Sequence, residues 1–193
     1  LPPERTYAAL PADAQALDVS FGEVHLRGWR PISEWPASEQ DWLLTGEAYT
    51  VELFWEVAQP TERIYQFYLG YFDAGERYAA LDRPLGTVSF PDTTTNYWQS
   101  QTIYGEIVSL RFNRDHPNLR SGQMRVGVWY WDEAGRIINV PTSAGESNVV
   151  LQSLAIFDPL MPPTLPEGLQ PITATFGELI QLTGYDFAEE AVS

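Results

Sequence analysis

Strand-length runs of alternating apolar and polar residues are the feature that most constrains the fold of this chain. In the clearest run, residues 49–57, the two sides are Val51, Leu53, Trp55 and Val57 against Thr50, Glu52, Phe54 and Glu56. Alternation with a period of two predicts a strand with one buried face. Sustained helical spacing of apolar residues is absent, and Gly or Pro interrupts every short interval. The chain is therefore expected to be all-β.

Further strand-like runs follow along the chain. We expect strands at 19–30, 49–57, 64–72, 78–81, 102–112, 123–132, 137–140 and 148–157. Short turns with Asp and Gly, at 73–75 and 132–135, predict two hairpins, and the polar segment 90–96 predicts a crossover between sheets. Short strands of this kind predict an antiparallel two-sheet β-sandwich, either jelly-roll or immunoglobulin-like. Its core should include Val51, Leu53, Trp55, Val126 and Val128.

The 193 residues suit one large domain, or one domain plus a fragment. Residues 1–16, rich in Pro and Ala, predict an irregular lead-in, and residues 17–157 the sandwich. Residues 158–171 contain five prolines and predict a linker, because proline cannot donate to a β-ladder and favours extended spacers. Residues 172–193 are expected to contain one further strand, from Ile172 to Phe187.

The end of the chain resembles an earlier part of it. Phe176-Gly177-Glu178 and the following residues to Tyr185 match Phe21-Gly22-Glu23 and the residues to Trp29 when one residue is gapped. The two Phe-Gly pairs are 155 residues apart, which is the size of a whole sandwich. Chance similarity between two strands is the alternative. We expect a tandem repeat whose second copy is cut after its first strand.

A lone strand would expose apolar side chains and unpaired backbone groups, so it should pair with a sheet edge. That edge could belong to the same domain or to another copy of the chain. Stiffness of the proline-rich linker favours the second arrangement, a strand-exchanged homo-oligomer.

Several motifs in order resemble one known family. They are Phe21-Gly22-Glu23, Leu26-Arg27-Gly28-Trp29, Gly46-Glu47, Val51-Glu52-Leu53-Phe54-Trp55, the hairpin from Tyr68 to Glu76 and the strand from Gly122 to Val128. Together they resemble the β-sandwich domains at the C-terminal, extracytoplasmic ends of bacterial polytopic membrane proteins of the glycosyltransferase type. The resemblance covers residues 17–157 and the partial second copy, and the longer aromatic run Trp129-Tyr130-Trp131 departs from it.

This resemblance implies an accessory domain on the cell surface or the periplasmic side, tethered through a parent membrane protein whose other domains are its partners. It supplies no catalytic residues. The chain begins at Leu1 without a Met or a signal-like segment, which suggests an excised piece or a mature product. No apolar run approaches the roughly 18 residues needed to span a bilayer, so no membrane insertion of this segment is expected.

Charge and composition limit the kinds of partner, metal and cofactor expected for this chain. The net charge of −15 repels phosphate backbones, which argues against nucleic acid. The chain has no cysteine, which excludes disulfides and thiolate chemistry. The two histidines, His25 and His116, form no metal-ligand motif, and no cofactor or metal is expected. Acidic residues in the two hairpin turns, Asp73, Glu76, Asp132 and Glu133, leave a calcium ion as an alternative to ordinary turn chemistry.

The carboxylates give no clear catalytic pair, so we expect no enzyme. Glu52 and Glu56 share one side of a strand but lie about 13 Å apart by strand rise, and a solvated face is their simplest interpretation. A glycoside hydrolase with two carboxylates from distant parts of the sequence is the least favoured alternative.

Outward aromatic residues are the best candidates for ligand binding. If Met124, Val126 and Val128 face the core, Trp129 and Trp131 face outward with Arg125. Two residues on one face lie about 7 Å apart, a spacing that suits a saccharide or a peptide. We name Trp129, Trp131, Arg125 and Phe54 as candidate ligand-binding residues. Packing of the same indoles against a linker or a neighbouring domain is the alternative.

Two hypotheses therefore lead. The first is a non-catalytic structural or interaction module of a larger membrane-anchored protein. The second is a carbohydrate-binding module that uses the outward aromatic residues.

Overall fold

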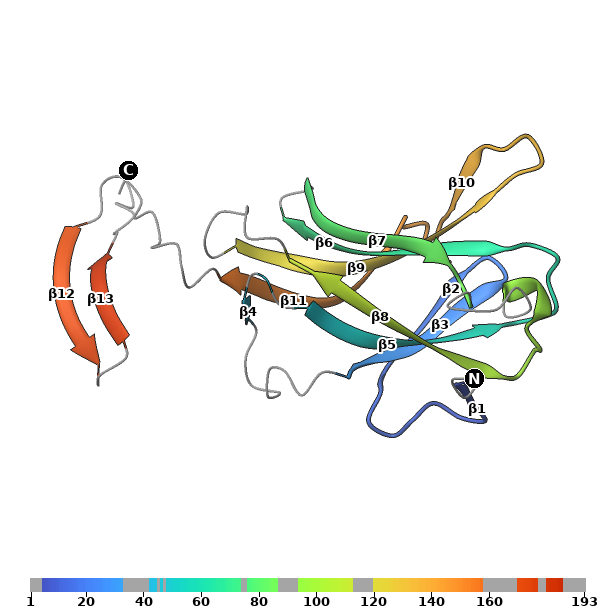
Figure 1. The fold of residues 1–193 in the computed structure, drawn as a ribbon, viewed down its shortest axis with the longest axis horizontal. Helices are drawn as coiled ribbons and strands as arrows, with labels where there is room; N and C mark the ends of the chain where they lie inside the picture. The colour runs from blue at the N-terminus through green and yellow to red at the C-terminus, as the bar shows by residue number, and fades with distance from the viewer. Residues whose placement is uncertain are drawn as a thin grey trace, which may run out of the picture. The chain divides into compact units, whose positions relative to one another are not determined.

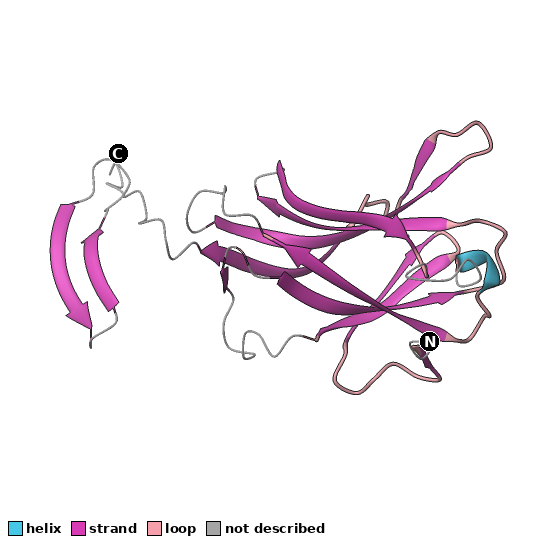
Figure 2. Cartoon of the chain, in the orientation of Figure 1, coloured by secondary structure: helices cyan, strands magenta, loops and turns pink. Residues whose placement is uncertain are grey.

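The computed structural model describes residues 5–32, 42–44, 46, 48–73, 76–86, 94–112, 120–157, 170–176 and 180–185. It divides into two units, residues 1–160 and residues 161–193, and each is described by itself. Within the described ranges the regular structure is β, apart from the short 3-10 helix η2 (Thr95–Tyr97) (Figure 2). The all-β prediction is confirmed.

The first unit contains two stacked sheets, as Figure 1 shows. The first sheet has the order β1-β8-β5-β3-β2, built from β1 (Thr6–Tyr7), β2 (Gln15–Phe21), β3 (Val24–Pro31), β5 (Ala48–Val57) and β8 (Ile103–Arg111). The second has the order β4-β11-β9-β6-β7 with β10 added beside β9. Its strands are β4 (Trp42–Leu44), β6 (Tyr65–Asp73), β7 (Glu76–Pro84), β9 (Arg120–Trp131), β10 (Ile137–Val140) and β11 (Val149–Phe157).

Strand pairing within these sheets is antiparallel, except that β4 runs parallel to β11. The predicted two-sheet antiparallel sandwich is therefore confirmed, with β4 as a short parallel addition at one edge.

The two predicted hairpins are confirmed as β6–β7 and β9–β10. In the second, the Asp132 carboxylate accepts hydrogen bonds from the backbone N–H groups of Ala134 and Arg136, at 2.9 and 2.8 Å. Gly135 completes the turn with a φ of +73°. Residues 74–75 and 90–93 of the predicted turn and crossover lie outside the described residues, as does His116.

The strand expected at 19–30 is in fact the end of one strand and the start of the next. β2 ends at Phe21 and β3 begins at Val24, with Gly22 in the left-handed region at φ +59°. Glycine adopts this backbone conformation without a steric penalty, which permits the tight reversal. The lead-in is also not wholly irregular, because Thr6 and Tyr7 form β1 against β8 and β2 begins at Gln15.

The core lies between the sheets. Val51, Leu53, Trp55, Val126 and Val128 are at most 1% exposed, as predicted. Large aromatic side chains from both sheets fill the same space, among them Phe21, Trp29, Tyr65, Phe67 and Tyr71. Truncating a buried side chain of this size typically costs about 3–5 kcal/mol.

The second unit contains two strands rather than the one predicted for residues 172–187. β12 (Gln170–Phe176) pairs antiparallel with β13 (Ile180–Tyr185). Residues 170 and 171, assigned to the linker from their sequence, belong to β12, and residues 158–169 lie outside the described residues. The error has the same origin as the one at residues 19–30, since each Phe-Gly-Glu motif begins where a strand ends.

A candidate binding face on the second sheet

The outward side of β9 carries the residues that the sequence singled out. Met124, Val126 and Val128 face the core and are at most 1% exposed. Trp129 and Trp131 point the other way, with Trp131 exposed to 54% and Trp129 partly buried. The facing assignment made from the sequence is therefore correct for this strand.

The two indoles form a corner rather than a flat platform. Their ring centroids lie 5.4 Å apart and their planes meet at 82°, an edge-to-face contact. Such a contact is itself favourable by about 0.5–1.5 kcal/mol, which holds the pair in place. One indole can offer its face to a planar or ring-shaped ligand while the other forms a side wall.

Two further aromatic rings from β6 lie on the same side of this sheet. Tyr68 is opposite Gly127 in the register, and a Cβ at Gly127 would lie 2.4–2.5 Å from atoms of the Tyr68 ring. A Cβ at Gly70 would lie 2.7 Å from the Phe72 ring. Glycine at these two positions therefore allows the tyrosine and phenylalanine rings to lie close against the backbone of the sheet.

Polar groups accompany the aromatic rings. The buried Gln66 lies opposite Trp129 on one side and the exposed Asn139 lies opposite it on the other. Further along β9, Arg125 donates two hydrogen bonds to the Gln123 side-chain oxygen, at 2.6 and 3.1 Å. Its guanidinium carbon lies 5.6 Å from the centroid of the Phe72 ring. Amide and guanidinium groups thus flank the rings.

Exposed aliphatic side chains extend the surface. Ile137 pairs with Trp131 and is 53% exposed, and Val150 pairs with Arg125 and is 39% exposed. We use the name aromatic face for the outward surface formed by Tyr68, Phe72, Arg125, Trp129, Trp131 and Ile137. Exposed apolar surface bordered by polar groups commonly marks a contact site.

Phe54 is not part of the aromatic face. It lies on β5 in the first sheet and is 0% exposed. The Tyr7 ring packs edge-on against it at 5.4 Å, and the Arg30 guanidinium lies 5.4 Å from its centroid. A side chain that is covered in this way cannot contact a ligand in this structure, so its assignment from the sequence is corrected.

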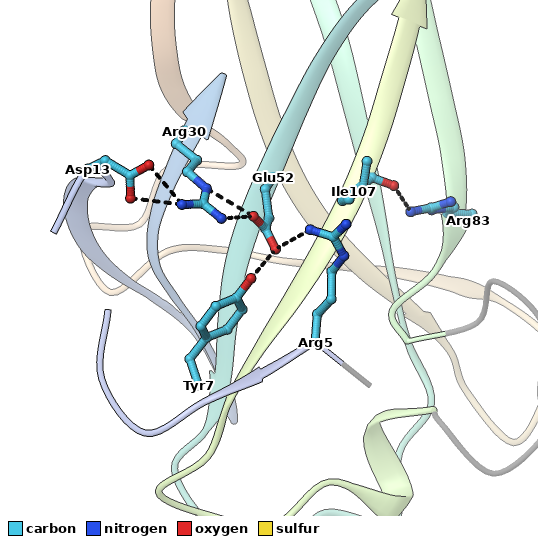
Figure 3. Close-up of polar contacts among 7 residues, drawn as sticks. All are labelled: Arg5, Tyr7, Asp13, Arg30, Glu52, Arg83 and Ile107. Carbon is cyan, nitrogen blue, oxygen red and sulfur yellow. Dashed lines mark hydrogen bonds and ion pairs between the residues drawn. The ribbon is translucent and has the colours of Figure 1, made fainter. Parts of the chain in front are cut away.

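Figure 3 shows the polar contacts of Glu52, which hold in place the Tyr7 and Arg30 side chains that lie against Phe54. The Glu52 carboxylate, on the same side of β5, is 0% exposed rather than solvated as expected. Arg30 donates to one oxygen through Nε and Nη2, at 3.0 and 2.7 Å. The other oxygen accepts from the Tyr7 hydroxyl at 2.8 Å and from Arg5 at 3.4 Å. Burial and the bond to Glu52 raise the pKa of Tyr7.

This cluster fastens the N-terminal segment to the outer side of the first sheet. Arg30 also binds both Asp13 oxygens at 2.8 Å, so its guanidinium joins the N-terminal segment to Glu52 on β5. Gly105 leaves the necessary room, because a Cβ there would lie 2.4 Å from Glu52 Oε1. Both oxygens of the buried carboxylate accept hydrogen bonds, and we use the name Glu52 lock for these contacts among Arg5, Tyr7, Asp13, Arg30 and Glu52.

Other carboxylates are also engaged. Glu56 binds Arg27 at 2.7 Å. Glu106 is buried between the sheets beside Arg83 and accepts from the Gly86 N–H at 3.2 Å, and its burial raises its pKa although Arg83 opposes this effect. Arg83 also donates to the Ile107 carbonyl at 2.6 Å (Figure 3). Within the described ranges, His, Asp and Glu side chains form no cluster of three suited to a metal ion.

The sequence pointed to Trp129, Trp131 and Arg125 but not to Tyr68 or Phe72. The glycines at 70 and 127, each in the middle of a strand, are the signal that could have identified them, because such glycines often mark close approach of another group. The Glu52 lock has no comparable sequence signal, since its residues come from separate segments.

Comparisons with known proteins place the chain in no family. No family model matches the sequence, and no curated protein sequence does. Among solved structures, one similar chain is a Niemann-Pick type C2 protein from Japanese carpenter ant. It is 11% identical over 78% of this chain and 99% of its own length, with a TM-score of 0.35.

The described residues include no helix that is both long and apolar enough to cross a membrane.

Proposed function

We propose that the sandwich is a non-catalytic interaction module that contacts its partner through the aromatic face. The observation that carries this proposal is the edge-to-face pair of the partly buried Trp129 and the exposed Trp131, with the exposed Ile137 opposite Trp131 on the neighbouring strand. Aromatic residues supply large contact areas for a small loss of side-chain entropy and are enriched where partners bind. The absence of an enzymatic role is part of this proposal.

The setting we propose is extracytoplasmic, within a larger membrane-anchored protein whose other domains are partners of this one. Support for this setting comes from the order of motifs between residues 21 and 128 that resembles such domains. A protease added to intact cells or to spheroplasts should cleave the protein. Full protection in both preparations, with cleavage only after lysis, would contradict this location.

The interaction is tested by binding of the chain to membranes of the cells that produce it. Trp131→Ala should reduce retention on these membranes about tenfold, a typical effect of losing an aromatic anchor. Tyr97→Ala is the matched control, because Tyr97 is 58% exposed on η2 and Trp131 is 54% exposed. Equal losses in both variants would show that the aromatic face has no special role.

A saccharide is the second candidate ligand, favoured by the shape of the aromatic face. Tyr68 and Phe72 lie close against the backbone at Gly127 and Gly70, and the exposed side-chain amide of Asn139 lies beside Trp129. Flat rings beside hydrogen-bonding amides suit the apolar and hydroxyl-bearing surfaces of a sugar.

Titration with a panel of soluble gluco-, manno-, galacto- and N-acetylglucosamine-based oligosaccharides tests this ligand class. Binding should quench Trp fluorescence in the wild-type chain and in Tyr97→Ala but not in Trp129→Ala. A panel with no response would remove the saccharide and leave a protein segment as the ligand class.

A further inference from the structure

We infer that the hairpin β12–β13 is a second copy of the hairpin β2–β3, and that the outer edge of β13 is shaped to accept a strand equivalent to β5. This inference does not depend on the function of the aromatic face. It concerns an interaction surface on the second unit, and its partner is an extended, antiparallel strand with apolar residues at alternate positions.

The pairing registers of the two hairpins coincide. In β2–β3 the partners are Gln15–Trp29, Ala16–Gly28, Val19–Leu26, Ser20–His25 and Phe21–Val24. In β12–β13 they are Gln170–Tyr185, Pro171–Gly184, Ala174–Leu182, Thr175–Gln181 and Phe176–Ile180. Both registers shift at the same step, after the second pair. A bulge at the same place in both hairpins is a specific feature, because bulges are positioned rather than random.

The buried side of the first hairpin has an apolar counterpart at every position. In β2–β3 the buried residues are Phe21, Val24, Leu26 and Trp29, each at most 1% exposed. The residues at the same register positions are Phe176, Ile180, Leu182 and Tyr185. A shift of one residue would turn this set to the opposite side of the sheet, so the match carries structural information.

The glycine beside the bulge is also present in both copies. A Cβ at Gly28 would lie 2.5 Å from the Gln15 carbonyl oxygen, too close for any other residue without movement of the backbone. Gly184 has the same register position and follows the same bulge. The close approach that requires glycine at position 28 therefore gives a reason for glycine at position 184.

Where the two hairpins differ, residues that contact each other in the first are replaced together in the second. In the first hairpin Asp18 and Arg27 form an ion pair at 3.3 Å, and Arg27 also binds Glu56 on β5 at 2.7 Å. Alignment of the registers places Thr173 and Thr183 at these positions. Both charges are replaced together, so neither is left alone, and a strand beside β13 needs no carboxylate at the position of Glu56.

The neighbour of β3 identifies the partner that β13 would take. Beyond β2, β3 pairs antiparallel with β5 from Val24–Val57 to Pro31–Val51. Among the described residues, β12 and β13 form a sheet of two strands, so the equivalent edge of β13 is open. The β5 of the first unit is already paired on both sides, with β3 and β8, so the partner assigned to this edge is a different strand with the same alternation of apolar residues.

A graft into the full chain tests the inference. Residues 15–29 are replaced by the sequence of residues 170–185, which places the sequence of β13 beside the native β5. Because register and core positions coincide, the chimera should keep a single cooperative unfolding transition. Amide protons in the grafted second strand should be protected from hydrogen exchange as those of β3 are. The same graft lacking the residue that corresponds to Gln181 is the control, and it should lose the transition because its core positions turn outward.

The full graft could fail to fold because Tyr185 and Ile180 differ in volume from Trp29 and Val24. A second, smaller graft addresses this possibility. It replaces residues 24–29 alone with residues 180–185 and retains β2. The inference is supported if either graft folds and its control, with one residue deleted, does not. Both grafts behaving like their controls would overturn it.

Discussion

At the scale of single residues, the least expected feature is the complete burial of Glu52 on the outward side of its strand. Burying a carboxylate is costly unless charged and hydrogen-bonding partners compensate, and here Arg30, Arg5 and Tyr7 do so. The Glu52 lock holds residues 5–13 over the first sheet and covers Phe54. It therefore removes from the outer surface a strand face that the sequence alone suggests is exposed.

Replacing Glu52 tests the Glu52 lock. Glu52→Gln removes the charge that Arg5 and Arg30 share, although Arg30 keeps Asp13, and should lower the free energy of unfolding by about 1.5–3 kcal/mol. Glu56→Gln, which removes a partly exposed partner of Arg27 on the same strand, should cost about 1 kcal/mol or less. Urea denaturation of both variants measures the difference. Equal costs would mean that the Glu52 contacts do not stabilise the fold.

Glu23 gives the chain a pH-dependent contact. A hydrogen bond from Thr61 lowers its pKa most, with further contributions from the Tyr65 hydroxyl at 2.9 Å and Arg63 at 3.3 Å. Because the pKa of Glu23 is lower in the folded chain, its ionised carboxylate stabilises the fold. This stabilisation is complete above the usual pKa of about 4.5 and is lost as the pH falls through the pKa of the folded chain.

Glu23→Gln should therefore flatten the acid side of the stability profile. The difference in urea midpoint between wild type and variant should be largest near neutral pH and should shrink below about pH 4.5. A difference that stays constant down to about pH 3 would show that ionisation of Glu23 does not contribute.

At the scale of elements, strand position follows from the sequence more readily than strand boundaries at tight turns. The hairpins β6–β7 and β9–β10 were predictable because Asp and Gly mark their turns between alternating runs. The turn after Phe21 was not, because two residues, Gly22 and Glu23, reverse the chain without interrupting the apolar pattern. The short strands β1 and β4 also lack a pattern, since a few residues cannot show alternation.

The candidate site was predictable to the same extent. Alternation along β9 placed Trp129 and Trp131 outward correctly, because Met124, Val126 and Val128 fix the opposite side in the core. Phe54 could not be excluded by its own strand, because the residues that cover it are Tyr7 and Arg30. Long-range contacts of this kind have no local sequence pattern.

The glycine at 127 links one strand to the shape of the aromatic face. Gly127→Ala should lower the free energy of unfolding by about 1–3 kcal/mol, because the new methyl group would meet the Tyr68 ring. In a Tyr68→Ala background the same substitution should cost much less, since the ring is gone. A double-mutant cycle of urea denaturation measures this coupling. Equal costs in both backgrounds would show that the ring does not lie against Gly127.

At the scale of the whole first unit, the two sheets present different outer surfaces. The first is partly covered by the N-terminal segment and carries ion pairs, including Arg27–Glu56 and Arg30–Glu52. The second carries the aromatic face, with Trp131 and Ile137 exposed beside each other. In a chain with a net charge of −15, a surface dominated by aromatic and aliphatic groups is distinct from the rest and is the region most suited to contact.

The most direct test of this account is site-specific photo-crosslinking in the cells that produce the protein. Benzoylphenylalanine is placed at position 131 on the aromatic face or at position 97 on η2, two sites of similar exposure. Our account predicts one discrete adduct from position 131, its loss when Trp129→Ala is added, and no equivalent adduct from position 97. A discrete adduct from position 97 with none from position 131 would contradict it.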